Sequence, residues 1–133
     1  MTTNASILVE IPAGELIDKI TILEIKAERI GDAGKLANIR AELSTLADTR
    51  DRFLAPSAVL SDLSAKLKAV NETLWVVEDD IRDCERHKDF SSRFIELARA
   101  VYFSNDVRAT IKRQINDLLN SPLVEEKSYA KYD

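Results

Sequence analysis

Apolar residues recur at helical spacing along most of the chain, which predicts a helical fold. The clearest pattern runs from Leu60 to Cys84, where apolar residues alternate steps of three and four, the spacing of a coiled-coil seam. Capping and helix-breaking residues indicate where each helix ends: Gly31 closes the first, and prolines follow the second and the fourth. The predicted helices cover residues 14–31, 33–54, 57–88 and 91–120.

The lengths of these helices limit how they can pack. At ~1.5 Å per residue, the third and fourth helices are each roughly 45 Å long, against roughly 30 Å for the first two. The first helix also carries apolar residues around much of its circumference, so it should contact neighbours on more than one side. We therefore expect an all-α fold, either an antiparallel four-helix bundle with a protruding arm or a helical-hairpin coiled coil whose exposed seam a second copy covers. Residues 1–133 are expected to form a single domain.

The two ends of the chain differ from the helices. Residues 5–11 are rich in β-branched side chains and end before Pro12, so we predict a short extended segment. Such a segment either lies along the helices as an apolar strap or pairs with the same segment of a second copy. Residues 121–133 form a tail that contains Tyr129 and Tyr132. We expect it to fold back over the helices with these rings partly buried, or otherwise to dock on a partner.

Composition and charge narrow the functional class. The chain of 133 residues has 45% apolar and 32% charged residues and a formal net charge of −4, so binding to nucleic acid is not expected. No stretch approaches the ~18 consecutive apolar residues of a membrane span. Cys84 is the only cysteine, which excludes an intramolecular disulfide and favours a reducing compartment. We expect a cytoplasmic protein.

The middle of the fourth predicted helix breaks its own apolar pattern. Ser104 and Arg108 occupy positions that apolar residues fill elsewhere in this helix, so polar groups should face the other helices. A buried arginine is costly unless a carboxylate pairs with it. One interpretation is therefore a closed salt-bridge network with an acidic residue of the third helix, Glu72, Glu78 or Asp79, that sets the register of the two helices.

The other interpretation is a pocket for a small anionic molecule. Arginine and lysine side chains would hold a phosphate or carboxylate, and aromatic rings would form an apolar wall. The candidate ligand-binding residues are Arg99, Tyr102, Asn105, Arg108 and Lys112 of the fourth helix, with Trp75 and Glu78 of the third.

No cofactor or metal ion is expected. The carboxylates of Glu24, Glu28 and the acidic run 78–80 alternate with basic residues, which is typical of a solvated helix face. Glu15 and Asp18 lie near the start of their helix, where negative charge compensates the helix dipole. The chain has neither a Glu-x-x-His motif nor a glycine-rich phosphate loop, and no serine or cysteine nucleophile can be paired with a base.

Four parts of the chain together resemble a bacterial family of short proteins of unknown function. They are residues 11–26 (IPAGELIDKITILEIK), Trp75 with the motif Glu78-Asp79-x-Ile81-Arg82, the stretch 94–115, and residues 125–129 (EEKSY). The resemblance spans nearly the whole chain. The family is loosely associated with genes for cell-surface polysaccharide synthesis, and the resemblance implies no established activity.

The leading functional hypothesis from the sequence is a non-catalytic helical assembly or accessory protein that acts through coiled-coil surfaces. Its partner would be a second copy, giving a homodimer, or another protein. The alternative is an enzyme or a binder of a small anionic molecule in a polar pocket between the third and fourth helices. The sequence leaves open whether the protein is an enzyme.

Overall fold

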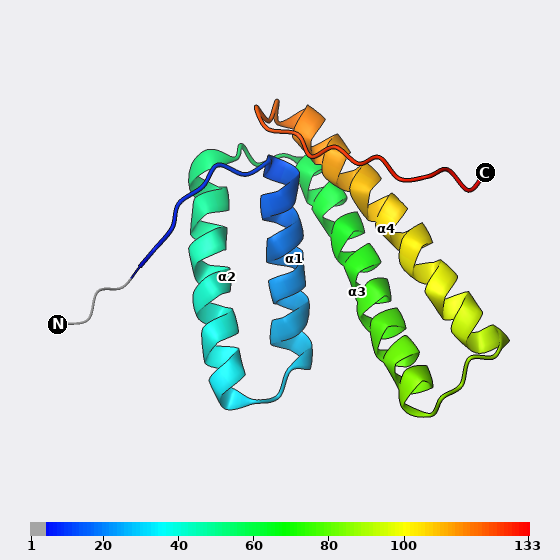
Figure 1. Cartoon of the computed structure of the whole chain (residues 1–133). Helices are drawn as coiled ribbons and strands as arrows, with labels where there is room; N and C mark the ends of the chain where they lie inside the picture. The colour runs from blue at the N-terminus through cyan, green and yellow to red at the C-terminus, as the bar shows by residue number, and fades with distance from the viewer. Residues whose placement is uncertain (1–4) are drawn as a thin grey trace.

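The computed structural model describes residues 5–133 and confirms the all-α fold (Figure 1). The four helices are α1 (Ala13–Arg29), α2 (Ala33–Phe53), α3 (Ala58–Arg86) and α4 (Ser92–Leu118). This part of the chain contains no strand, and each helix end lies within two residues of the position expected from the sequence. Side-chain caps explain two of the helix starts, because Asp32 accepts a hydrogen bond at the start of α2 and Ser57 accepts one at the start of α3.

The helices form two hairpins, and α1 is the helix that joins them. It packs against each of the other three helices, whereas α2 packs against α1 alone. Figure 1 shows that the two hairpins lie closest at the N-terminal ends of α1 and α3 and diverge toward the opposite end of the molecule. The wide apolar surface of α1 is what allows it to contact several neighbours. The fold is therefore a helical bundle in which α2 lies outside the shared core.

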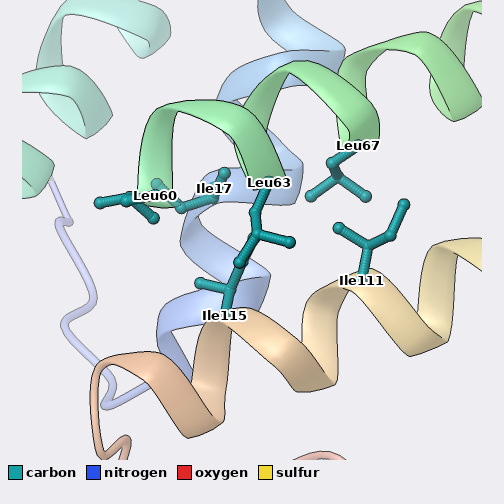
Figure 2. Close-up of a cluster of buried hydrophobic side chains, with 6 residues drawn as sticks. All are labelled: Ile17, Leu60, Leu63, Leu67, Ile111 and Ile115. Atoms are coloured by element: carbon teal, nitrogen blue, oxygen red, sulfur yellow. The ribbon is translucent and has the colours of Figure 1, made fainter. Parts of the chain in front are cut away.

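The main hydrophobic cluster joins α1, α3 and α4 at the end where the hairpins meet (Figure 2). Its buried members are Ile17 of α1, Leu60, Leu63 and Leu67 of α3, and Ile111 and Ile115 of α4. Leu67 and Ile115 have no exposed surface. Burying a side chain of this size stabilises the fold by roughly 1.5–3 kcal/mol. The cluster therefore holds α1 on the α3–α4 hairpin.

The apolar seam of α3 is covered within one chain. Its residues are buried or half-buried from Leu60 to Cys84, because α4 packs along α3 and α1 packs against both. This contradicts the expected arrangement in which an exposed seam is covered by a second copy. Phe53, the last residue of α2, is 73% exposed, because α2 packs against no helix besides α1.

The N-terminal segment does not form a strap along the helices. Residues 5–12 have no regular secondary structure, and Ile7, Leu8 and Val9 are 84%, 93% and 72% exposed. The strap was one of two expectations for this segment and is wrong. The structure leaves these three adjacent apolar side chains without a covering surface among the described residues.

The tail, residues 121–133, folds back along α4. Glu126 pairs with Arg113 at 3.1 Å, and the hydroxyl of Tyr132 donates a hydrogen bond to the Asp106 carboxylate at 2.5 Å. The end of the tail thus contacts a residue nearer the start of α4 than its beginning does. The tail folds back as expected, but Tyr129 and Tyr132 are 75% and 56% exposed, and only the Tyr132 ring packs on α4, against Tyr102 and Phe103.

Candidate functional site

Asp18 of α1 lies in the interior of the protein although its side chain is a carboxylate. It is 1% exposed, and it faces Arg108 of α4. Arg108 donates through Nε to Oδ1 at 2.9 Å and through Nη2 to Oδ2 at 2.5 Å, so one guanidinium binds both carboxylate oxygens. Bidentate pairs of this kind are among the strongest contacts between side chains. The hydrogen bond to Asp18 raises the pKa of Arg108, which keeps the arginine charged.

Asn71 of α3 joins the same network. Its Nδ2 donates to Asp18 Oδ1 at 2.9 Å and to Thr21 Oγ1 at 3.0 Å. Thr21 in turn donates to the backbone carbonyl of Asp18 at 2.8 Å. Because Arg108 approaches the same carboxylate from α4, the network ties three helices together at one point. It sets the register of α1 against both α3 and α4.

Lys112 of α4 forms a second group of ion pairs beside the first. Its Nζ donates to Glu15 of α1 at 2.7 Å and to Glu125 of the tail at 2.8 Å, and it lies 4.0 Å from the Asp18 carboxylate. Burial lowers the pKa of Lys112, but the hydrogen bonds to Glu125 and Glu15 outweigh burial, and the net direction is upward. The hydrogen bond from Lys112, followed by that from Lys127, lowers the pKa of Glu125 to about 2. Lys112 therefore attaches the tail to α1 and α4.

The start of α1 lies directly against the end of α4. No side chain of α1 caps this end, and its free amides are bound by other parts of the chain. The amide of Gly14 donates to Asn116 Oδ1 at 2.7 Å, and the amide of Ala13 donates to Ser121 Oγ at 3.2 Å. A Cβ atom on Gly14 would collide with the backbone carbonyl of Lys112, so only glycine permits this approach. The contact brings the acidic face of α1 against the basic residues of α4.

A pocket of about 350 Å³ opens beside the Asp18–Arg108 pair, between α1, α3 and α4. The residues that line it are Ile22 and Ile25 of α1, Asn71, Leu74, Trp75, Glu78 and Asp79 of α3, and Asn105 and Arg108 of α4. Four of the candidate residues chosen from the sequence, Trp75, Glu78, Asn105 and Arg108, therefore lie around one pocket. Asn105 also accepts a long hydrogen bond from Arg108 Nη1, at 3.4 Å.

The other three candidate residues lie elsewhere on α4. Lys112 borders a separate pocket of about 310 Å³ between α4 and the tail. Tyr102 lines a third pocket, of about 710 Å³, and its ring lies 5.3 Å from that of Tyr132. Arg99 stacks over Phe103, with 5.5 Å between Cζ and the ring centroid. None of these three residues lines the pocket beside the Asp18–Arg108 pair, although Asn105 lines the Tyr102 pocket as well and Lys112 lies near the same Asp18 carboxylate.

The carboxylate that pairs with Arg108 is not one of those expected. The third helix offered Glu72, Glu78 and Asp79, but the partner is Asp18 of α1. The reason is that α1 packs against both α3 and α4 and places its own buried carboxylate between them. The expectation considered only the contact between the third and fourth helices, whereas α1, α3 and α4 meet at Arg108.

Sequence reasoning missed several residues of the network. Asp18 had been assigned to compensation of the helix dipole, whereas it is buried and paired. A signal for it exists, because Gly14, Asp18 and Thr21 follow one another at steps of four and three and form a small, polar stripe within an apolar helix. No comparable signal marks Asn71, whose partners Asp18 and Thr21 lie 53 and 50 residues away in the chain. None marks Glu125 either, which reaches Lys112 because the tail turns back along α4.

The geometry does not favour the expected anionic ligand. Arg99, Arg108 and Lys112 are the cations proposed to hold it. Arg108 and Lys112 already donate to carboxylates, and Arg99 lies over the Phe103 ring and does not line the pocket. A phosphate or carboxylate would have to displace these partners. Displacement would leave the buried Asp18 carboxylate unpaired, which is strongly unfavourable.

Two other kinds of site are not found in residues 5–133. No group of three or more His, Cys, Asp or Glu side chains is placed to hold a metal ion. No helix in this range combines the length and the apolar character that crossing a membrane requires. His87, the single histidine of the chain, lies exposed at the C-terminal end of α3.

A known protein family matches the chain over nearly its whole length. It is a family of unknown function, DUF6165, and the match covers residues 7–132. The matched range includes all four helices, most of the exposed N-terminal segment and nearly all of the tail. No curated protein and no solved structure matches the chain.

Breaking the Asp18–Arg108 pair from one side is expected to destabilise the protein strongly. In Asp18→Asn or Arg108→Met, one group loses its partner in the interior, and each variant should lose roughly 3–5 kcal/mol of unfolding free energy. The double variant should lose clearly less than the sum of the two, because it leaves no unpaired charge. Urea denaturation followed by circular dichroism measures these values.

The control for this comparison of the single and double variants is Arg82→Met. Arg82 is exposed and lies 3.9 Å from Glu78, so its removal should change the unfolding free energy by no more than about 0.5 kcal/mol. Losses that add up in the double variant to within about 0.5 kcal/mol would show that Asp18 and Arg108 do not interact.

Acidification is expected to release the tail. Lys112 holds the pKa of Glu125 at about 2, below the ordinary value of 4.5, so ionised Glu125 favours the docked tail. This contribution is fully present above pH 4.5 and is lost as the pH falls through about 2. An NMR titration of the Glu125 side chain, with amide hydrogen exchange in the tail, measures both effects.

Two matched variants make this test specific. Glu125→Gln should loosen the tail already at neutral pH, because Lys112 then loses a charged partner. Glu126→Gln should have a much smaller effect, since its ion pair with Arg113 is exposed. A Glu125 carboxylate that titrates at its ordinary pKa would refute the ion pair with Lys112.

Proposed function

The chain belongs to this family of unknown function, and we propose that it is a non-catalytic helical protein that assembles with a second copy of itself through residues 5–11. The observation that carries the proposal is the exposure of Ile7, Leu8 and Val9, each above 70%. Adjacent apolar and β-branched residues with unpaired backbone groups readily pair with another strand. A chain that exposes them in water gains stability when a partner covers them.

The segment is suited to pairing with its own copy. Around a two-fold axis, each segment meets the same residues in reverse order, so one surface serves both chains. Glu10 is the only charged residue among residues 5–11. In an antiparallel pairing centred on Leu8 or Val9, Glu10 faces Ser6 or Leu8 of the other copy. The pairing therefore brings no like charges opposite each other.

A two-stranded ribbon alone is marginally stable, so contacts between the helical parts belong to the proposal. Phe53 and Val59 flank the connection between α2 and α3, and both are exposed. Figure 1 shows this connection at the same end of the molecule as the start of α1, from which the segment departs. These side chains are available to pack against the ribbon or against the second copy.

Further parts of the proposal concern the biological process and the cell compartment in which the protein acts. The resemblance to a bacterial family associated with cell-surface polysaccharide genes supports an accessory role in such a process. The single cysteine, Cys84, is buried and free, which supports a reducing compartment such as the cytoplasm. In this setting the assembled protein would act by holding partners together.

Size-exclusion chromatography with multi-angle light scattering tests the assembly. Wild-type protein at micromolar concentration should have the mass of a dimer. Leu8→Pro should be monomeric, because proline removes a backbone donor in the middle of the paired segment. Its helix content by circular dichroism should be unchanged, since Leu8 contacts no helix core.

The matched control is Leu8→Thr at the same position. Threonine keeps the backbone donor and a high strand propensity, so this variant should still dimerise, although more weakly. A wild-type protein that stays monomeric as its concentration rises, or a Leu8→Pro variant that dimerises as well as wild type, would refute the proposal.

A further inference from the structure

The pocket beside the Asp18–Arg108 pair is lined by a side chain whose acceptor oxygen receives no hydrogen bond from the described residues, 5–133. Asn71 is 5% exposed and lines this pocket. Its Nδ2 uses both hydrogens on Asp18 and Thr21. No residue in the range 5–133 donates to its Oδ1, which is accessible from outside the protein. A nearly buried amide oxygen with no protein partner needs a donor from a bound molecule or from water.

A tryptophan and two carboxylates of α3 line the same pocket as Asn71. Trp75, Glu78 and Asp79 are spaced by three and four residues, so they share one helix face, and all three line the pocket. Glu78 makes only a 3.9 Å contact with the highly exposed Arg82. Asp79 pairs with none of the described residues. The face of an indole ring attracts a cation, and carboxylates accept hydrogen bonds from the N–H groups of that cation.

The remaining wall of the pocket does not offset this negative charge. Arg108 is the only basic residue in the lining, and its Nε and Nη2 are bound to Asp18. Arg108 and Asp18 together are neutral, so the net charge at the pocket comes from Glu78 and Asp79. Such a pocket concentrates cations and repels anions.

We infer that this pocket binds a small organic cation that carries an ammonium group. The ammonium group donates to Asn71 Oδ1 and Glu78, and the alkyl part of the molecule lies against Trp75 and Leu74. A volume of about 350 Å³ is near the lower end of the range for small-molecule sites. The site therefore fits a small amine and not a segment of another protein. It lies apart from residues 5–11 and does not depend on assembly.

Trp75 provides a direct measurement of binding, because it is the only tryptophan in the chain and lies in the pocket. Putrescine, agmatine and ethanolamine are titrated into wild-type protein while Trp75 fluorescence is recorded, with sodium chloride at equal ionic strength as the reference. At least one of these cations should give a saturable change in the millimolar range or below. Inorganic phosphate and glucose should give none.

Two glutamine substitutions on α3 distinguish the pocket from general attraction by an acidic surface. Glu78→Gln should weaken the responding cation about tenfold, a difference of about 1.4 kcal/mol. Glu72→Gln removes an equal charge six residues earlier on α3, outside the pocket, at a side chain of similar exposure. This control should bind as wild type does.

Several outcomes would overturn the inference. One is the absence of a saturable response to all three cations. Another is a saturable response to phosphate or glucose but not to the cations, which would assign the pocket a different ligand class. A third is equal weakening by Glu78→Gln and Glu72→Gln, which would show that surface charge and not the pocket attracts the cation.

Discussion

The fold depends on one buried carboxylate. Asp18 would be costly in the interior without partners, and its carboxylate accepts hydrogen bonds from two other helices, through Arg108 of α4 and Asn71 of α3. Thr21 of α1 accepts the second hydrogen bond of the same Asn71 amide. Hydrophobic contacts can hold helices together in many registers. The bidentate Asp18–Arg108 pair and the Asn71 amide, which donates two hydrogen bonds, allow only one register of the three helices. A shift of any of these helices would leave a buried charge unpaired.

The polar network also explains where the pocket lies. Along α3, the buried apolar cluster extends to Leu67, the network follows at Asn71, and the pocket is lined from Asn71 to Asp79. The same order holds along α4 in reverse, from Ile111 through Arg108 to Asn105. Apolar packing thus closes one end of the three-helix contact. Beyond the network the hairpins diverge, and side chains with free polar groups line the opening.

The fold could be predicted from the sequence because its signals are local. The seam from Leu60 to Cys84 and the capping residues each act over a few residues, and the helices follow them. The break in the pattern at Arg108 correctly marked a position with a buried partner. The same local reasoning placed four candidate residues around one pocket, since they lie near the middle of adjacent helices.

The partners themselves could not be predicted in this way. Asp18 and Arg108 are 90 residues apart in the chain, and which carboxylate reaches the arginine depends on how α1 docks. That docking depends on Gly14, where the absence of a Cβ atom lets α1 approach α4. The tail contact of Glu125 with Lys112 is of the same kind, since it needs the α1 surface already in place.

The most direct test of this account is the NMR signal of the Arg108 Nε–H group. If Arg108 and Asp18 are paired as described, Arg108 Nε lies 2.9 Å from Asp18 Oδ1, and the Nε proton should exchange slowly with water because it is held in this hydrogen bond. Its signal should persist at a pH where the Nε–H signal of exposed Arg82 has disappeared through exchange. An Arg108 Nε–H that exchanges as fast as that of Arg82 would contradict the claim that a buried ion pair organises the fold.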